Sequence, residues 1–209
     1  FFEDVVAPTN YLADSQGTQL VDGVVQTAAA FDGVYQQMID GGWCCLNGST
    51  EYGGAGLPGV IDVASQEMLQ SSNSALSLLP MLSRGVIHAL NLYGSDEQKN
   101  TYLGNIITGV WSGTMNLTEP QAGTDLSAVQ TKATPDGDHF LISGQKIYIT
   151  WGDHELAENV IHLVLARIPG APEGNNGISL FLVPKYLPNA DGSIGRANDV
   201  RVVGIEHKL

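Results

Sequence analysis

The hydrophobic pattern of this chain changes from helical to extended periodicity close to Trp111. Before that position, apolar residues recur at the spacing that places them on one face of a helix. After it, short runs rich in β-branched residues alternate with polar residues, and turns containing glycine or proline separate them. This order predicts an α+β multidomain chain. An all-α helical domain is expected at 1–111, followed at 112–209 by a β-domain whose antiparallel strands close as a barrel or sandwich.

Several helices are predicted in the first domain. Apolar residues at helical spacing favour one helix over 24–39, which a glycine pair ends. Further helices are predicted over 59–70 and 76–92, and the second of these is apolar on most sides, which indicates burial. The stretch SDEQ, which starts at Ser95, has the pattern of a capping box and predicts the start of another helix.

The second domain is predicted to be built from strands joined by turns. The sequence PDGD, at 135–138, is typical of a hairpin turn and follows an alternating run that starts at Val129. The predicted strands that follow this turn cover 139–150, 160–168, 178–185 and 199–208.

Composition limits the classes of partner. The 209 residues are 43% hydrophobic, which is enough for a packed core, and no run of about 18 apolar residues predicts a membrane-spanning helix. Lysine and arginine total 9 against 22 acidic residues, for a formal net charge of −13. Because the basic residues are scattered, this charge argues against binding to nucleic acid or to an anionic membrane.

The cysteines and histidines do not have the spacing of a metal site. Cys44 and Cys45 are adjacent, so they lack the pattern of a zinc or redox motif, and they are expected to be buried thiols in a reducing, cytoplasmic compartment. The five histidines are scattered and include no pair at ligand spacing. No metal is therefore predicted.

Two loops combine residue types that suit either a turn or a binding site. In the first, Glu119-Pro120 marks irregular chain, and Gly123 and Thr124 provide backbone freedom and a hydroxyl. The second follows KIYIT, where Thr150 and the next residue, a tryptophan, come together at the end of a predicted strand. From the residue types alone, both alternatives stay open.

Three stretches resemble signatures of the acyl-CoA dehydrogenase family. They are EYGGAGLPG at 51–59, MNLTEPQAGTDLSAVQTKAT at 115–134 and GQKIYITWG at 144–152. The region 151–188 is similar to the longer members, which include the 3-methylmercaptopropionyl-CoA dehydrogenases and a DNA-repair-associated flavoprotein branch. By this resemblance the chain is a fragment that holds the N-terminal helical domain and most of the middle β-domain, and the C-terminal helical bundle is missing.

The resemblance implies that the chain binds FAD. Leu117 and Thr118 are expected at the isoalloxazine ring, and Gly123 and Thr124 at the pyrophosphate. From the second stretch, Tyr148 and Thr150 are expected to flank the flavin, with Thr150 near N5 and O4. Two departures from the family pattern concern the packing against the ring: many relatives have an aromatic residue at Met115 and a tryptophan at Tyr148.

The activity implied by the resemblance is α,β-dehydrogenation of an acyl-CoA thioester in fatty acid metabolism, with a short acyl group such as 3-methylmercaptopropionyl. In this family the base is a glutamate of the C-terminal domain, so it is expected beyond Leu209. The fragment itself is then inactive, and Glu119 fixes its own loop rather than serving as a general base. The implied partners are an electron-transfer flavoprotein or similar acceptor and further copies of the chain in a homo-oligomer.

Two other functions were weighed against dehydrogenation. The first is a flavin-containing, DNA-associated binding protein with vestigial dehydrogenase activity, which the net charge of −13 argues against. The second is a β-module without a cofactor, which is disfavoured because both flavin-facing stretches are intact.

Overall fold

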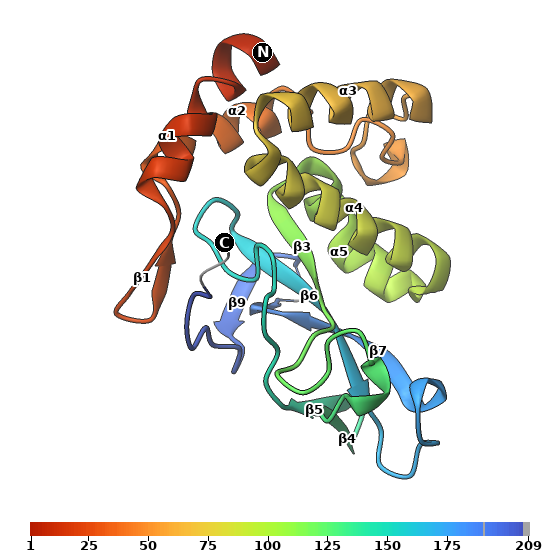
Figure 1. Ribbon diagram of the computed structural model, residues 1–209. Coiled ribbons are helices and arrows are strands. Elements are labelled where there is room, and N and C mark those ends of the chain that lie inside the picture. The colour runs from red at the N-terminus through yellow and green to blue at the C-terminus, as the bar shows by residue number, and fades with distance from the viewer. Residues whose placement is uncertain (190, 207–209) are drawn as a thin grey trace.

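The computed structural model describes residues 1–189 and 191–206, and in it a helical part lies against a β-sheet (Figure 1). The predicted order of a helical domain followed by a β-domain is confirmed. Where the two divide stays a prediction, because Trp111 starts the first strand of the sheet but is buried among residues of both parts. The helical part contains η1 (Phe2–Val6), α1 (Thr9–Gln16), β1 (Gln19–Val21), β2 (Val24–Gln26), η2 (Ala29–Phe31), α2 (Val34–Asp40), η3 (Thr50–Tyr52), α3 (Gly59–Ser72), α4 (Ser74–Tyr93) and α5 (Asp96–Thr108).

The helix predicted over 24–39 is wrong in its first half. Residues Val24–Gln26 form β2, which pairs with β1 as a small antiparallel hairpin, and α2 begins only at Val34. Two turns explain the difference. The hairpin turn Asp22-Gly23 has positive φ at both residues, 50° and 79°, as a type I′ turn requires. Gly33 then has a φ of 72°, which interrupts any helix that would cross it.

The other helical predictions are confirmed. α3 and α4 span the predicted ranges and extend them by a few residues. The capping box at the start of α5 is present: the Ser95 hydroxyl accepts a hydrogen bond from the Gln98 N–H at 3.2 Å, and the Gln98 side chain accepts one from the Ser95 N–H at 3.0 Å. These features were predictable because capping and helical periodicity depend on residues close in sequence.

α4 is the central helix of the helical part. Within the described residues it is also the one helix long and apolar enough to cross a membrane by length and composition, contrary to the prediction that no segment is. Its buried residues include Leu76, Leu79, Val86 and Leu90, which pack in two hydrophobic clusters with neighbouring elements. In this structure α4 therefore serves as a core helix.

The β-domain is built around one mixed sheet. Its strands are β3 (Trp111–Asn116), β4 (Lys132–Asp136), β5 (His139–Ser143), β6 (Asn159–Arg167) and β7 (Ile178–Pro184). β6 pairs with β3 in parallel over the whole length of β3, and with β7 in antiparallel orientation. A separate hairpin is formed by β8 (Tyr186–Pro188) and β9 (Ile194–Ala197).

The predicted antiparallel arrangement is therefore corrected. The β4–β5 hairpin is antiparallel, as PDGD indicated, but β3 and β6 are parallel because the chain between them makes a long crossover that includes this hairpin. Among the described residues the strands form an open five-stranded sheet and the β8–β9 hairpin, without closure into a barrel.

Two of the predicted strands differ from the structure: one ends earlier than predicted, and the other is not formed in its described part. The strand predicted over 139–150 ends at Ser143, and residues 144–150 are irregular. Positive φ at Tyr148, 58°, is incompatible with a continuous strand. The strand predicted over 199–208 is not formed in its described part, 199–206, and its last two residues lie outside the described residues.

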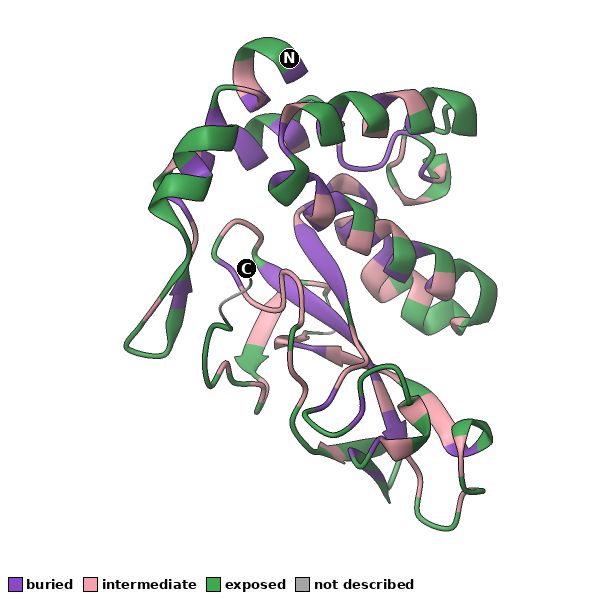
Figure 2. Cartoon of the chain, in the orientation of Figure 1, coloured by how far each residue is buried: buried purple, intermediate pink, exposed green. Residues whose placement is uncertain are grey.

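The sheet and the helices share a core at the contact between β3 and α4. Figure 2 shows that β3 and β6 are the most continuously buried strands. A Cβ added at Gly113 would lie 2.5 Å from a methyl group of Val86, and the Gly113 N–H donates to the Ser83 hydroxyl at 2.9 Å. The backbones of β3 and α4 can therefore approach closely at Gly113. This contact fixes the position of β3 and of the chain that follows it. Cys44 and Cys45 are free and buried, as predicted.

Candidate active site

The loop that follows β3 is organised around the buried carboxylate of Glu119, which is only 3% exposed. This carboxylate accepts hydrogen bonds from the backbone N–H groups of Gln130 and Thr131, at 2.8 and 3.1 Å, and from the Thr131 hydroxyl at 2.5 Å. The side chains of Gln121 and Lys146 donate to it at 2.6 and 2.8 Å. Glu119 therefore joins three segments of chain.

The environment of Glu119 keeps it ionised. Burial raises the pKa of this carboxyl group, but the hydrogen bonds from Lys146, from the Thr131 hydroxyl and from two backbone N–H groups outweigh burial and lower its pKa to about 2. A carboxylate with this pKa and with both oxygens occupied is poorly suited to remove a proton at neutral pH. The prediction that Glu119 fixes its loop is confirmed.

The two stretches predicted to face the flavin lie side by side. The Lys146 ammonium donates to the Leu117 carbonyl oxygen at 3.0 Å, and the Ile147 N–H donates to the Thr118 carbonyl oxygen at 2.9 Å. Further along, the hydroxyl of Thr114 donates to the Thr150 carbonyl oxygen at 2.8 Å. The irregular chain after Gly144 is thus attached to the end of β3 and to the residues that follow it.

Lys146 and Thr114 were not identified from the sequence as site residues. Lys146 is 8% exposed at its side chain, and it connects Glu119 to the second stretch. The signal available was a single lysine in the otherwise apolar KIYI, because a lysine beside a buried segment needs an acidic partner. Thr114 gave no comparable signal, since its partner is a backbone carbonyl 36 residues away.

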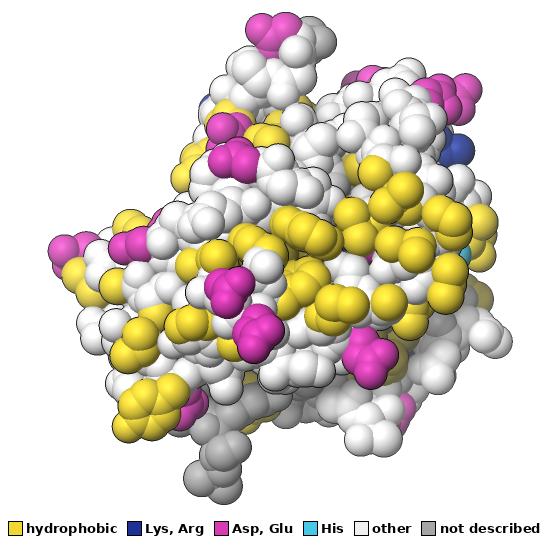
Figure 3. Space-filling view, turned by 90° about the horizontal axis from the view of Figure 1, so that it is seen from above, with side chains coloured by type: hydrophobic (Ala, Val, Ile, Leu, Met, Phe, Trp, Pro, Cys, Tyr) yellow, Lys and Arg dark blue, Asp and Glu magenta, His cyan; other side chains and the backbone are white. Residues whose placement is uncertain are grey.

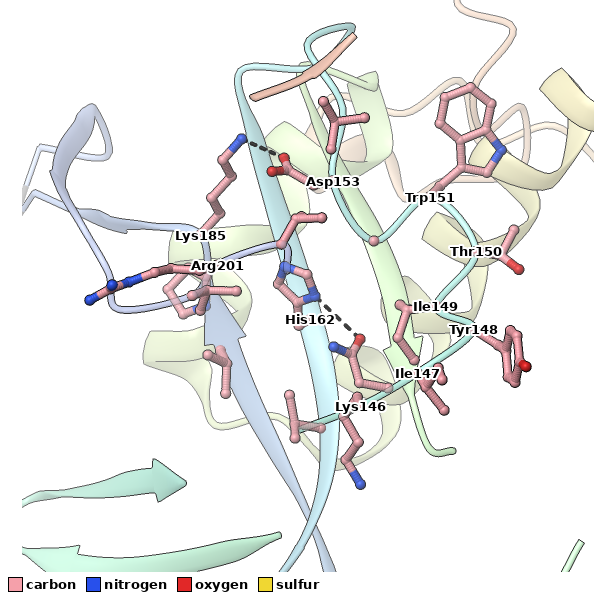
Figure 4. Close-up of a pocket in the computed structure, with 18 of the residues that line it drawn as sticks. Lys146, Ile147, Tyr148, Ile149, Thr150, Trp151, Asp153, His162, Lys185 and Arg201 are labelled. Atoms are coloured by element: carbon pink, nitrogen blue, oxygen red, sulfur yellow. Dashed lines mark hydrogen bonds and ion pairs between the residues drawn. The ribbon is translucent and has the colours of Figure 1, made fainter. Parts of the chain in front are cut away.

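The side chains of Tyr148 and Thr150 project to the same side of their stretch, away from His162 and Lys185 (Figure 4). Tyr148 is 53% exposed, and Met115 at the end of β3 is 36% exposed. Within residues 1–189 and 191–206, the hydroxyls of Thr118 and Thr150 donate to no protein acceptor. Accessible apolar side chains beside free hydroxyl donors fit a flat ring system with polar edges, and so they fit the flavin implied by the resemblance.

The loop that contains Gly123 and Thr124 is held separately. Reciprocal backbone hydrogen bonds between Glu119 and Ala122 make a tight turn before Gly123. A Cβ added at Gly123 would meet no atom within 4 Å, so space is open beside it. In the described part of the chain the Thr124 hydroxyl also has no protein partner. Hydrogen bonds join the two stretches at Leu117, Thr118 and Thr150, whereas none in the described part joins Gly123 or Thr124 directly to Tyr148 or Thr150.

A large open groove of about 2180 Å³ runs along the sheet and the helical part (Figure 4). Of the seven predicted residues, only Tyr148 and Thr150 line it. The remaining predicted residues lie outside its lining; they are Met115, Leu117, Thr118, Gly123 and Thr124. The groove lining and the set of residues predicted to contact the flavin therefore share only the 148–150 segment.

Two buried histidines support the chain next to this segment. His154 Nδ1 accepts a hydrogen bond from the Leu156 N–H at 3.2 Å, so Nε2 carries the proton and lies 2.9 Å from the Ser112 hydroxyl on β3. Burial lowers the pKa of both His154 and His162 to about 4, so both rings are neutral at pH 7. Among the described residues, no group of three or more His, Cys, Asp or Glu side chains could hold a metal ion.

Comparison with known proteins addresses the resemblance directly. The family profile for the N-terminal domain of acyl-CoA dehydrogenases matches residues 7–110, and the profile for the middle domain matches residues 114–205. The chain belongs to the acyl-CoA dehydrogenase family. Both profiles lie in the order that the sequence indicated, and together they cover the helical part, the loop of Glu119 and the mixed sheet.

Individual acyl-CoA dehydrogenases are similar over most or all of the chain. The 3-methylmercaptopropionyl-CoA dehydrogenase of Ruegeria pomeroyi is 47% identical over 210 residues, which cover 100% of this chain and 36% of that protein. The acyl-CoA dehydrogenase structure from Geobacillus kaustophilus has a TM-score of 0.70 at 27% identity and covers 88% of this chain and 44% of its own. A glutaryl-CoA dehydrogenase from Mycobacterium smegmatis, in complex with FADH2, has a TM-score of 0.68 at 23% identity, covering 90% and 45%.

The match is partial with respect to the relatives. This chain spans about a third of the length of the curated acyl-CoA dehydrogenases that it matches first. The site residues described above are therefore only one part of the active site of a full-length relative.

Proposed function

We propose that this chain forms the flavin-binding part of an FAD-dependent dehydrogenase that oxidises the α,β-bond of a short acyl-CoA thioester. The observation that carries the proposal is the pairing of the 114–118 and 146–150 segments, which brings the free hydroxyls of Thr118 and Thr150 and the exposed side chains of Met115 and Tyr148 onto adjacent stretches of chain. Membership of the family supports the reaction class. The names of relatives, among them the 3-methylmercaptopropionyl-CoA and butyryl-CoA dehydrogenases, support a short acyl substrate.

The protein residues contribute orientation and hydrogen bonds in this proposal. When bound, FAD would supply the acceptor for the hydride that leaves the β-carbon. Leu117, Tyr148 and Met115 would pack against the ring system, and the hydroxyls of Thr118 and Thr150 would donate to its polar edge. Hydrogen bonds from fixed donors to a group that gains negative charge stabilise the charged form selectively, and this is the main electrostatic contribution available to this surface.

The loop at Gly123 and Thr124 would hold the pyrophosphate. The open space at Gly123 allows the backbone N–H to approach an anionic oxygen, and the Thr124 hydroxyl is available as a second donor. Arg167 stabilises the chain that follows, because its guanidinium donates to the carbonyl oxygens of Ser127 and Val129 at 2.6 and 2.8 Å.

The proton-abstracting base is proposed to lie in sequence that follows Leu209, as the resemblance implies. A helical bundle supplied from there, or from another copy of the chain in a homo-oligomer, would find apolar surface on the helical part. Val60, Val63 and Met68 of α3 are exposed, and Figure 3, which looks down on the helical part, shows apolar side chains gathered across it. An electron-transfer flavoprotein as acceptor and a cytoplasmic location stay predictions.

The DNA-associated alternative receives no support from relatives such as the 3-methylmercaptopropionyl-CoA and butyryl-CoA dehydrogenases, whose names state a dehydrogenase activity. The formal net charge of −13 is also opposite in sign to what a phosphate backbone attracts.

Replacing Thr150 with valine tests the proposed flavin contact. Valine keeps the shape of the threonine side chain and removes its hydroxyl donor. We therefore expect the activation free energy of flavin reduction to rise by roughly 1–3 kcal/mol, with folding intact. Thr118→Val is expected to act in the same direction. The measurement is the rate of flavin bleaching after anaerobic mixing with butyryl-CoA.

The matched control is Thr134→Val, because Thr134 is exposed on β4 and lies outside both the groove and the paired segments. Its reduction rate should equal that of the wild type. Unchanged rates in both Thr150→Val and Thr118→Val would contradict the placement of these two residues at the flavin.

A further inference from the structure

Trp151 has a backbone conformation that is unusual for a bulky residue. Its φ is 51°, in the left-handed region, which is sterically unfavourable for a residue with a Cβ. Such conformations persist where surrounding contacts enforce them, and they concentrate at functional sites. Trp151 directly follows Thr150, so the strain lies one residue from a proposed flavin contact.

The contacts that enforce this conformation come from the helical part and from His154 in the same loop. The indole N–H donates to the carbonyl oxygen of Ala75, in the first turn of α4, at 3.0 Å. The ring lies 6.0 Å from that of Phe31 in η2 and meets His154 edge-on at 5.3 Å. Figure 4 shows the Trp151 ring directed toward the helices, on the side of its stretch where Thr150 and Tyr148 project. The indole therefore spans the space between the flavin segment and α4.

Trp151 and its two partners in the helical part, Phe31 and Ala75, all line the large groove. On the helical side the lining includes four apolar residues, Ala28, Phe31, Ala75 and Leu78, besides polar ones such as Thr27 and Ser74, and on the other side it includes Tyr148, Thr150 and Trp151. The apolar part of this lining, beside a hydroxyl proposed to face the flavin, suits an acyl chain. Because consecutive Cα atoms are only about 3.8 Å apart, the indole begins one residue from Thr150 and lines the groove close to the proposed reacting position.

We propose that Trp151 sets the acyl-chain length by closing the acyl space beyond the reacting carbons. This inference rests on the proposed dehydrogenase function and deepens it, because it assigns the short-chain preference to one side chain. The hydrogen bond to Ala75 and the packing on Phe31 keep the indole from swinging aside, so a longer chain cannot enter by displacing it. Enlarging the acyl space should then admit longer chains.

The test compares chain-length preference in variants of the full-length protein with bound flavin. We measure kcat/KM for butyryl-CoA and octanoyl-CoA in the wild type, in Trp151→Ala and in Trp151→Phe. The wild type is expected to prefer butyryl-CoA. Trp151→Ala is expected to raise the octanoyl-to-butyryl ratio of kcat/KM at least about tenfold, because accommodating or excluding one methylene group changes kcat/KM by about tenfold or more. Trp151→Phe, which shortens the side chain but keeps an aromatic ring, should lie between them.

The matched control is Trp43→Ala. Trp43 also lies in an aromatic cluster, stacked on Phe1 at 5.7 Å, but it does not line the groove. Its octanoyl-to-butyryl ratio should equal that of the wild type. A purely structural role for Trp151 would lower both kcat/KM values together and leave the ratio unchanged, and that result overturns the inference.

The wild-type measurement separates this inference from the function on which it rests. If the flavin-loaded wild type oxidises butyryl-CoA and octanoyl-CoA equally well, the inference and the short-chain preference fail, and the proposed acyl-CoA dehydrogenation stands. If it oxidises no thioester, both fail. Because the wild type alone gives these outcomes, the inference can be overturned even if Trp151→Ala does not fold.

Discussion

Replacing Glu119 with alanine is expected to lower the free energy of unfolding by about 3–5 kcal/mol and to abolish flavin binding. The substitution leaves the ammonium of Lys146 buried without its carboxylate, and it leaves the N–H groups of Gln130 and Thr131 without their acceptor. The loop of Gly123 would then lose its anchor. The measurements are denaturant unfolding at pH 7 and flavin content after purification.

The pH dependence of this effect provides its internal check. Because the folded-state pKa of Glu119 is lowered to about 2 from an ordinary value of 4.5, its stabilising contribution is fully present above about pH 4.5. It is lost as the pH falls through the folded-state pKa, so the difference between Glu119→Ala and the wild type should shrink below pH 4.5. Glu158→Ala, which removes an exposed carboxylate, should change stability little. A difference of less than about 1 kcal/mol between Glu119→Ala and the wild type at pH 7 would contradict the role assigned to Glu119.

A protein that ends at Leu209 is expected to show no measurable dehydrogenation, even when FAD is supplied. Loss of a positioned base costs roughly 10²–10⁴ in rate, and loss of substrate positioning adds further orders of magnitude. The carboxylate of Glu119 cannot replace the base, because five hydrogen bonds hold it in its own loop.

This second prediction is measured by comparing the shortened and full-length proteins with butyryl-CoA and an artificial electron acceptor. Activity in the shortened protein that disappears on Glu119→Gln would show that Glu119 is the base. Activity that survives this substitution would place the base elsewhere within residues 1–209. Either result contradicts the proposal that the base follows Leu209.

The fold was predictable where neighbouring residues decide it. The ranges of α3 and α4 and the capping box of α5 follow from periodicity and from side chains within one helical turn. The turn Asp22-Gly23 was also a local signal, but the apolar spacing after it was interpreted as a helix instead. The parallel pairing of β3 with β6 was not predictable in this way, because it depends on a crossover between distant segments.

The candidate site shows the same limit. The residues of the two stretches could be selected from the family resemblance. The single lysine in KIYI indicated an acidic partner, but not that Lys146 would join Glu119 to Leu117. The alternation of KIYIT favoured a strand through Thr150, whereas the structure has left-handed backbone at Tyr148 and Trp151. This conformation depends on contacts with β3 and with the helical part, so it could be found only from the structure.

The central claim is that the paired 114–118 and 146–150 segments hold FAD for oxidation of an acyl-CoA, and the visible spectrum of the full-length protein tests it most directly. The account predicts a yellow protein with stoichiometric FAD, whose flavin absorbance bleaches when butyryl-CoA is added without oxygen. A colourless protein that gains no flavin absorbance on incubation with FAD would contradict it.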